Sequence, residues 1–240
     1  DVEAFWKDIV IDLTTTEEFN WFIAQGYLKR LVPRPTNAEI DVSGLRKRSG
    51  EYVTSDVEKL TNTEAKIREI CDEICEMGFD RRSWMVFAAG NANSELVCAE
   101  LNRRGVSTVS ITDKTPKKER EQAISDFKAY KIRCIVNNNI LTTGFDHPGV
   151  DLIAVVRVTT STQLWVQMLG RGTRPVFVEG FDLSTQEGRL QSIAASGVHN
   201  CLVLDFAGNS KRLGAINAPV KPKTKGEGGG GEAPIKTCDA

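Results

Sequence analysis

The residues best suited to bind an anion are two arginines in the segment QMLGRGTR at residues 167–174. Arg171 and Arg174 stand three residues apart after an apolar stretch, and Gly170 and Gly172 flank the first of them. A guanidinium group can donate two parallel hydrogen bonds to phosphate oxygens, and glycine lets backbone and ligand approach closely. The pattern predicts a phosphate-binding pair. The alternative interpretation is a solvated helix C-terminus whose arginines compensate the helix dipole.

A second polar segment, NNNILTTGFDHP at residues 137–148, directly follows an apolar segment that is expected to be a strand. Open parallel sheets bind ligands beyond the carboxyl ends of their strands, so this position favours a binding loop. Gly144 and short polar side chains offer hydrogen-bond donors, and Asp146 offers a carboxylate for a ribose hydroxyl. The alternative is a turn that uses Asn, Thr and Gly for their backbone conformations.

The elements that must position these residues alternate regularly along the chain. Continuous apolar segments predict strands at 84–89, 106–111, 132–136, 151–158 and 201–206. Helical spacing of apolar residues predicts helices at 63–77, 94–104, 116–130 and 162–169. Apolar strands that alternate with helices of about 10–15 residues are typical of a parallel sheet covered on both faces. Right-handed crossovers then give a three-layer α/β sandwich with a mostly parallel sheet.

The pattern divides the chain into three parts. Residues 1–60 are expected to be a connector or peripheral segment, in which Pro33 and Pro35 break the chain. Residues 61–206 carry the regular alternation. Residues 207–240 are expected to be a flexible tail, because they are basic at first and then rich in glycine.

Composition excludes several classes of protein. The 240 residues are 40% hydrophobic and 26% charged, which is ordinary for a domain with a sizeable core. Six cysteines at scattered spacings predict neither a disulfide framework nor a metal site, and favour the cytoplasm. No apolar run approaches the roughly 18 residues of a membrane span, so no membrane partner is expected. The chain begins without Met, and we expect it to be a fragment of a longer protein.

The net charge of −1 is unevenly distributed. Residues 81–140 carry 11 basic and 6 acidic side chains, whereas residues 1–80 carry 10 basic and 17 acidic ones. A mildly basic middle third is compatible with contacts to phosphates. It is far from the strongly basic surface of an obligate nucleic-acid-binding module.

Together these segments resemble the C-terminal motor domain of superfamily-two helicases. MVFAAGN at 85–91 is similar to the motif IV strand and turn, and Glu119-Arg120 with Phe127 to the segment before motif V. Residues 138–146 resemble motif V, and residues 167–174 resemble motif VI. The segments at 26–28, 40–45 and 50–52 are more narrowly similar to the junction between the motor domains of RadD-like DNA-repair helicases and related phage helicases.

This resemblance implies a RecA-like (P-loop NTPase-like) sheet and a role for each matching residue. The motif VI arginines, Arg171 and Arg174, would be catalytic and reach the γ-phosphate of ATP held by the preceding motor domain. The residues implied to contact nucleotide are Gln167, Gly170, Gly144 and Asp146. The residues implied to contact the nucleic-acid backbone are Gly90, Asn91, Asn138 and Thr142. Asn138 replaces a phosphate-contacting threonine of the relatives.

The chain contains no G-x-x-x-x-G-K-[ST] segment, so it has no Walker A motif of its own. ATP and Mg²⁺ are therefore expected to be held mainly by the N-terminal RecA-like domain of the same parent chain, and the fragment alone is expected to be inactive. A zinc module follows the motor in the RadD-like subgroup, but Cys238 is a single ligand and predicts no metal site.

The resemblance predicts half of an ATP-dependent DNA helicase or translocase that acts in DNA repair in the cytoplasm. Its expected partner is single-stranded or branched duplex DNA, with RNA also open. Two alternatives remain at this point. One is a non-catalytic nucleic-acid-binding or protein-docking module, and the other is the translocase part of a restriction enzyme, which shares the Q-x-x-G-R-G-x-R pattern.

Overall fold

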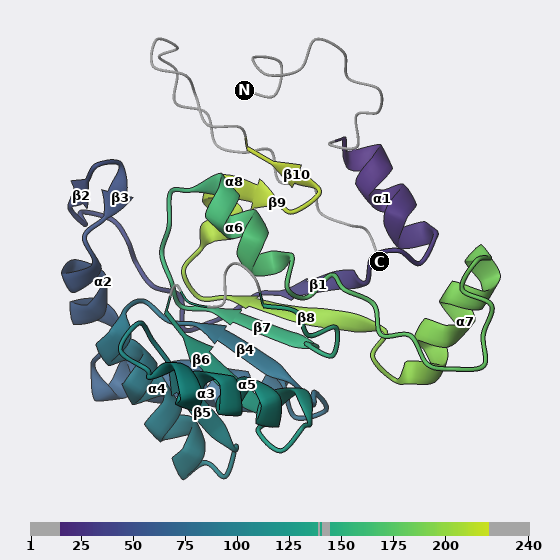
Figure 1. The fold of residues 1–240 in the computed structure, drawn as a ribbon. Coiled ribbons are helices and arrows are strands. Elements are labelled where there is room, and N and C mark those ends of the chain that lie inside the picture. Colours follow the sequence, from purple (N-terminus) through teal and green to yellow (C-terminus); the bar gives the residue numbers. More distant parts are fainter. Residues whose placement is uncertain (1–14, 139, 141–144, 221–240) are drawn as a thin grey trace.

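The computed structural model describes residues 15–138, 140 and 145–220. Six strands form one sheet in the order β1-β8-β7-β4-β6-β5, and every neighbouring pair is parallel (Figure 1). In that order the strands are β1 (Arg30–Arg34), β8 (Asn200–Asp205), β7 (Leu152–Val155), β4 (Trp84–Phe87), β6 (Cys134–Asn137) and β5 (Thr108–Ile111). All carboxyl ends of these strands therefore lie at one edge of the sheet.

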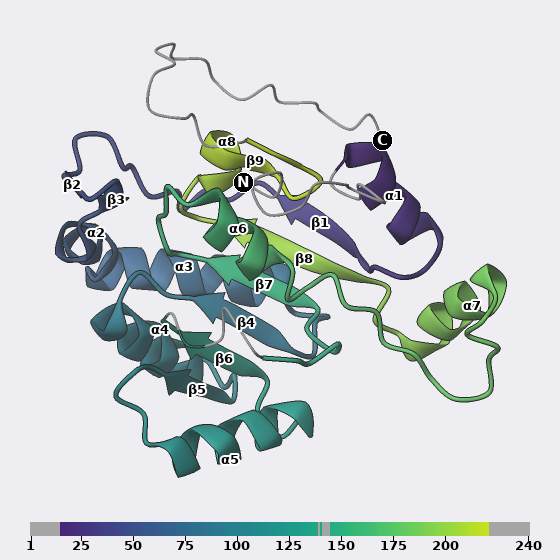
Figure 2. The same ribbon diagram turned by 45° about the horizontal axis from the view of Figure 1, so that its top comes forward.

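Helices cover both faces of the sheet, and Figure 2 shows α3 and α6 on opposite sides of it. The helices are α1 (Thr16–Ala24), α2 (Thr54–Thr61), α3 (Glu64–Met77), α4 (Asn91–Arg103), α5 (Lys117–Lys128), α6 (Thr162–Leu169), α7 (Gln186–Ser196) and α8 (Asn209–Leu213). Two small antiparallel hairpins complete the described elements: β2 (Lys47–Arg48) with β3 (Glu51–Tyr52), and β9 (Gly214–Ala215) with β10 (Ala218–Pro219). The predicted three-layer α/β sandwich with a parallel sheet is confirmed.

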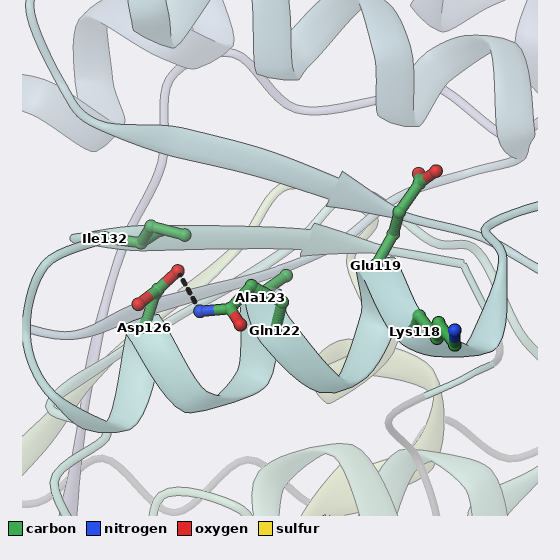
Figure 3. Close-up of a pocket in the computed structure, with 6 residues that line it drawn as sticks. All are labelled: Lys118, Glu119, Gln122, Ala123, Asp126 and Ile132. Carbon is green, nitrogen blue, oxygen red and sulfur yellow. Dashed lines mark hydrogen bonds between the residues drawn. The ribbon is translucent and has the colours of Figure 1, made fainter.

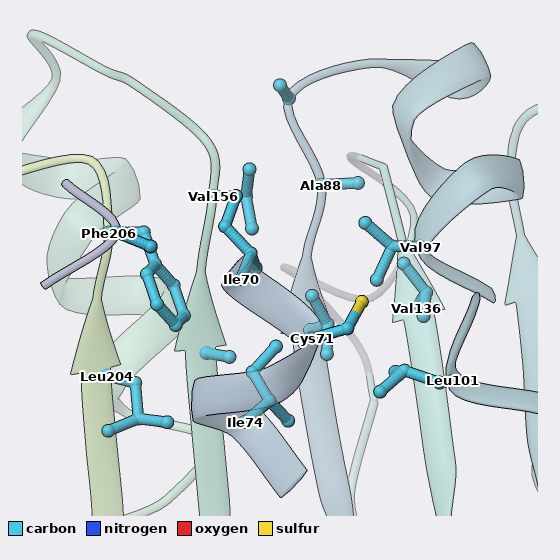
Figure 4. Close-up of a cluster of buried hydrophobic side chains, with 14 of the residues drawn as sticks. Ile70, Cys71, Ile74, Ala88, Val97, Leu101, Val136, Val156, Leu204 and Phe206 are labelled. Atoms are coloured by element: carbon cyan, nitrogen blue, oxygen red, sulfur yellow. The ribbon is translucent and has the colours of Figure 1, made fainter. Parts of the chain in front are cut away.

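The alternation of side chains along each strand builds two separate cores. In β4, Trp84 and Val86 face α3 and α4, whereas Met85 and Phe87 face α5 and α6. Successive residues of a strand point to opposite faces, so a strand covered on both sides must be apolar throughout. Figure 4 shows the first core, where Ile70 of α3 packs among side chains from the strands and from α4.

The first strand of the sheet lies where the sequence indicated a break in the chain. Residues 30–34 form β1, which pairs in parallel with β8 and places Pro33 opposite Val203. Proline has no amide hydrogen to donate, and an edge strand tolerates it because one side of that strand has no partner. Residues 30–34 are thus part of the sheet and not of a peripheral connector.

The end of the described chain is also structured further than its composition suggested. Residues 209–213 form α8, and Leu213 is buried against the second core. The hairpin β9–β10 follows, and the Trp165 indole of α6 donates to the carbonyl oxygen of Gly214. Residues 221–240, which include Cys238, lie outside the described residues. The boundaries predicted at residues 60 and 206 stay a prediction.

The cysteines and acidic residues of the described chain form no metal cluster. Cys71, Cys75, Cys98, Cys134 and Cys201 are free thiols. Burial raises the pKa of the Cys71 thiol to about 12, as expected for a small core side chain. No group of three or more His, Cys, Asp or Glu side chains in the described residues could hold a metal ion. Within the same residues, no helix has the length and apolar character needed to cross a membrane.

The core packing of α3 gives a testable prediction. Ile70 is 0% exposed, and Ile70→Ala is expected to lower the free energy of unfolding by about 2–5 kcal/mol through lost burial and a residual cavity. Ile70→Val should cost about 0.5–1.5 kcal/mol, and Leu96→Ala at an exposed position of α4 less than about 0.5 kcal/mol. Urea unfolding followed by circular dichroism measures all three. Equal losses for Ile70→Ala and Leu96→Ala would contradict the packing described.

Candidate functional site

The two arginines of the motif VI segment converge on one backbone carbonyl. The Arg171 Nη1 donates to the carbonyl oxygen of Phe145, and the Arg174 Nη1 donates to the same oxygen at 2.9 Å. The Arg174 Nη1 also donates to Asp146 Oδ1 in an ion pair. The structure therefore brings together the end of the motif V segment and the motif VI arginines, which are more than 20 residues apart in sequence.

The two arginines differ in their access to solvent. Arg171 is 8% exposed, whereas the side chains of Arg174 and Asp146 are 36% and 71% exposed. Burial lowers the pKa of Arg171, as does the nearby charge of Arg174, while the Asp146 carboxylate acts in the opposite direction. Both guanidinium groups donate to the same carbonyl oxygen, and their joint contact with one anionic ligand stays a prediction. Arg174 is accessible, and Arg171 is turned toward the protein interior.

The arginines lie near the amino ends of the strands and not at the carboxyl edge. The amide of Lys29, just before β1, donates to the carbonyl oxygen of Thr173 at 2.5 Å. A Cβ atom on Gly172 would lie 2.6 Å from the Sγ atom of Cys201, near the start of β8. Gly172 thus permits close packing on the sheet and not the approach of a ligand. The arginines and Asn138, which begins the motif V segment, therefore lie at opposite edges of the sheet, because α6 carries the chain back across it.

Lys29 contributes to this region, and sequence reasoning missed it. Its side chain is buried, with Lys29 1% exposed, and its Nζ donates to the carbonyl oxygens of Pro148 at 3.0 Å and Val150 at 2.6 Å. Burial lowers the pKa of Lys29. A single lysine before a short edge strand carries no sequence signal for such a role. Lys29 and Arg171 together hold residues 145–150 by their backbone carbonyls.

A second polar cluster occupies the carboxyl edge of the sheet. Asn138, after β6, donates through Nδ2 to Asn91 Oδ1 at 2.8 Å, and Asn91 donates to Asp113 Oδ1 at 2.7 Å. Arg157, after β7, donates through Nη1 to Asn138 Oδ1 at 2.9 Å. The structure thus places the predicted Asn91 and Asn138 together and adds Asp113 and Arg157. Those two follow strands, which is the positional signal that could have found them.

Gly90 and the start of α4 lie beside this cluster. A Cβ atom at Gly90 would lie 2.2 Å from Glu58 Oε1 of α2, so the Glu58 carboxylate lies directly against this glycine. The Glu58 carboxylate accepts from the amide of Asn93 at 3.4 Å. A carboxylate is favourable at the positive end of a helix dipole. Glu58 therefore caps α4, whose N-cap residue is Gly90 without a side chain of its own.

The remaining predicted residues have simpler positions. Gln167 is half-buried on α6, and Gly170 is the C-cap of that helix. The hydroxyl of Thr173 donates to the carbonyl oxygen of Gly170 at 3.0 Å, which tightens the turn before Arg174. Thr142 and Gly144 lie outside the described residues, so their predicted contacts stay predictions.

His147, next to Asp146, is packed among aromatic rings. It is 7% exposed, and its ring centroid lies 5.1 Å from that of Phe127 and 5.5 Å from that of Tyr130. Burial lowers the pKa of His147 to about 4, and the charges of Lys128 and Lys29 act in the same direction. At neutral pH the imidazole is therefore uncharged. This environment identifies His147 as a core residue that directly follows the motif V segment.

A depression elsewhere on the surface has no part in either cluster. Figure 3 shows it along α5, where Gln122 donates to Asp126 Oδ2 at 2.9 Å. Its lining residues are Lys118, Glu119, Gln122, Ala123, Asp126 and Ile132. It contains none of the arginines or asparagines described above, so the site rests on the convergent polar side chains and not on a deep cavity.

Comparison with known proteins identifies the same region. Residues 65–175 match the family model described as the helicase conserved C-terminal domain. A Schizosaccharomyces pombe protein described as a mitochondrial ATP-dependent helicase, irc3, is 32% identical over 157 residues, or 65% of this chain and 23% of the relative. A Saccharomyces cerevisiae protein described as an ATP-dependent helicase, IRC3, is 26% identical over 188 residues, or 76% of this chain and 24% of the relative.

Two further similarities extend the comparison. A 51.5 kDa protein of a Lactococcus phage (isolate 7-9) is 26% identical over 169 residues, or 70% of this chain and 36% of that protein. The chain thus spans well under half the length of each of these three relatives. A solved fragment described as an HsdR subunit of a type I restriction enzyme from Vibrio vulnificus YJ016 superimposes with a TM-score of 0.56 at 17% identity. That match covers 81% of this chain and 36% of the other, and it shows a shared fold.

The environment of His147 predicts a pH-dependent stability. The folded pKa is about 4 and the unfolded pKa is about 6.5, so between these values the unfolded state binds more protons. The free energy of unfolding should therefore fall by up to about 3 kcal/mol as the pH is lowered from about 6.5 to about 4.

Urea unfolding at a series of pH values measures this loss. His147→Gln should remove the His147 component of the pH dependence whatever its effect at neutral pH. His199→Gln, at an exposed position, is the matched control and should retain it. The interpretation fails if His147→Gln and the wild type show the same slope between pH 4 and 6.5.

Proposed function

We propose that this chain is the C-terminal half of an ATP-dependent helicase or translocase motor, because residues 65–175 match the model of the helicase conserved C-terminal domain. The convergence of Arg174, Asp146 and the Phe145 carbonyl is the observation that carries the proposal. It joins the two segments that resemble motifs V and VI through an exposed ion pair, in which a phosphate ligand could replace the Asp146 carboxylate. The descriptions of two relatives as ATP-dependent helicases support it.

Arg174 is the arginine finger in this proposal. Its half-exposed side chain already holds an anionic oxygen, that of Asp146, so a phosphate oxygen of comparable charge can take the same place. ATP supplies the γ-phosphoryl group, held by the N-terminal RecA-like domain of the same parent chain. Arg174 would then stabilise the negative charge that develops in phosphoryl transfer.

Arg171 acts through the backbone rather than on the nucleotide. Its buried guanidinium group holds the Phe145 carbonyl and so fixes the position of Asp146 and, through the shared carbonyl, of Arg174. Gln167 and Gly170 lie on α6 and in its C-terminal turn, and would support the same surface. The described residues offer no carboxylate cluster for a divalent cation. We therefore place Mg²⁺ with the N-terminal domain.

The asparagine cluster at the carboxyl edge is the proposed contact for nucleic acid. Asn91 and Asn138 carry amide groups that can donate to phosphate oxygens, and Gly90, the N-cap residue of α4, directly precedes Asn91. DNA, as a single strand or a branched duplex, is the proposed track, and a role in DNA repair is proposed with it. Contacts to phosphates distinguish poorly between the deoxyribose of DNA and the ribose of RNA, so every binding test includes RNA beside DNA.

The non-catalytic module and the restriction-enzyme translocase make different predictions. A non-catalytic module would show no ATP hydrolysis in the full-length protein with or without DNA. A restriction-enzyme subunit would show nuclease activity in the same assembly. The similarity to the HsdR fragment is a similarity of fold and gives no support for nuclease activity. The cytoplasmic location stays a prediction, since one relative is described as mitochondrial.

The finger role predicts the phenotype of Arg174→Ala in the full-length protein. DNA-stimulated ATP hydrolysis should fall by about 10³–10⁵-fold, because charge stabilisation in the transition state is lost. Affinity for single-stranded DNA should change little, since Arg174 lies away from the carboxyl edge. Arg103→Ala, an exposed arginine of α4 paired only with Glu100 among the described residues, is the matched control and should retain activity. ATP turnover near the wild-type rate in Arg174→Ala would falsify the finger role.

The absence of a Walker A segment predicts the behaviour of the chain by itself. Residues 1–240 should hydrolyse no ATP above background in a coupled-enzyme assay with Mg²⁺ and DNA, since the sequence has no G-x-x-x-x-G-K-[ST]. Adding the N-terminal motor domain should restore hydrolysis. Turnover by residues 1–240 alone would show that this chain holds triphosphate without a partner domain.

A further inference from the structure

The small hairpin β2–β3 presents two cations at its tip. Ser49 and Gly50 connect the strands with φ values of 52° and 85°, so both central residues are left-handed, as in the tight turns that favour hairpins. Lys47 and Arg48, just before the turn, are both exposed. Figure 1 shows the hairpin projecting beyond α2 at the margin of the molecule.

Glu51 fixes the hairpin to the carboxyl edge of the sheet. Its carboxylate accepts from the Thr159 hydroxyl at 3.1 Å and from the Thr160 amide at 3.1 Å. The Thr160 hydroxyl donates back to the Gly50 carbonyl oxygen at 2.7 Å. These threonines follow the carboxyl end of β7. The hairpin is therefore held at the same edge as the asparagine cluster, although it lies about 100 residues earlier in the chain.

The same edge links the hairpin to that cluster. Arg157 stands two residues before Thr159, which donates to Glu51 of the hairpin. The Arg157 Nη1 donates to Asn138 Oδ1 of the asparagine cluster. The Glu51 charge favours the cationic form of Arg157, whose pKa is lowered by burial. On the other side, α2 begins directly after the hairpin and places Glu58 against Gly90. The hairpin is thus linked to the proposed nucleic-acid contacts through the loop after β7 and through α2.

The charges at the tip are available to an anion. In the described part of the chain, no carboxylate lies within 4.0 Å of Lys47 or Arg48, whereas the neighbouring Arg46 is paired with Asp56 at 2.7 Å. The Lys47 Nζ lies 4.7 Å from the centroid of the Tyr52 ring, on the second strand of the hairpin. An aromatic face orients a cation without neutralising it. The tip therefore carries two exposed positive charges on an anchored support.

We propose that the tip of the β2–β3 hairpin, through Lys47 and Arg48, binds the phosphate backbone of a nucleic-acid strand and extends the contact surface of Asn91 and Asn138. A nucleic-acid strand carries regularly spaced phosphates, and a protein binds it through several contacts along the strand. The two cations of the hairpin and the two asparagine amides can supply such contacts. This inference rests on the proposed function, because it adds a contact to the same strand. It assigns a role to residues 46–52, outside motifs IV to VI.

The test is the salt dependence of binding in the full-length protein. Affinity of Lys47→Ala/Arg48→Ala for fluorescein-labelled oligothymidylate should fall by about 10–30-fold at 0.1 M salt, measured by fluorescence anisotropy. The slope of log affinity against log salt should become shallower by about 1.4, as expected for two lost phosphate contacts to a single strand. Lys128→Ala/Lys131→Ala removes the same charge from the amino-end side of the sheet and should leave the affinity within about twofold.

ATP hydrolysis provides a second readout. The DNA concentration for half-maximal stimulation should rise by the same factor as the dissociation constant, while the rate at saturating DNA should stay unchanged. Lys47→Glu/Arg48→Glu should weaken binding further, because it adds repulsion. An oligouridylate arm shows whether the contact distinguishes RNA from DNA.

The outcomes separate this inference from the proposed function. A wild-type protein that binds oligothymidylate, with hairpin variants that bind equally well, overturns the hairpin contact and leaves the motor proposal intact. A wild-type protein that binds neither oligothymidylate nor oligouridylate at low salt overturns both. Equal losses in the hairpin variant and in Lys128→Ala/Lys131→Ala would also overturn the hairpin contact, since net charge alone would then explain the effect.

Discussion

Three cationic side chains hold one short stretch of backbone, and the arrangement of Arg174 and Asp146 depends on these contacts. Lys29 binds the carbonyl oxygens of Pro148 and Val150, while Arg171 and Arg174 bind that of Phe145. A buried cation is costly unless its donors find acceptors, so Lys29 and Arg171 strongly favour this backbone conformation. Lys29 and Arg171 thus fix this stretch from the protein interior. Arg174 lies at the surface and is paired with the exposed carboxylate of Asp146.

The parallel sheet explains why this stretch is separate from the asparagine cluster. In a parallel sheet each connection must return from the carboxyl end of one strand to the amino end of the next. The connection from β6 to β7 therefore starts at the carboxyl edge with Asn138 and ends near the amino ends, after Asp146. In the proposed function, the two ends of this connection therefore serve different ligands.

The carboxyl edge is assembled from segments far apart in sequence. Asn91 follows β4, Asn138 follows β6 and Arg157 follows β7, while Glu51 brings an early hairpin to the same place. Glu58 supplies the charge that caps α4 and lies against the glycine at position 90. Two acidic residues of the first 80 positions, Glu51 and Glu58, thus act as anchors. The Glu51 carboxylate holds in place the hairpin that carries the exposed positive charges.

The sequence by itself determined the parallel sandwich, since strands buried on both faces must be apolar throughout and the helices between them must be amphipathic. It also determined which segments approach each other, because the motif-like stretches follow strands or helices in a fixed order. It missed β1, since Pro33 and two exposed arginines carry no strand pattern, and it missed Lys29 for the same lack of local signal. Arg157 was also missed, although it follows a strand. Only the tertiary structure decided that Arg171 is buried and Arg174 accessible. The spacing of three residues after a helix places the two side chains near each other. The burial of each side chain depends on which distant part of the backbone its guanidinium group contacts.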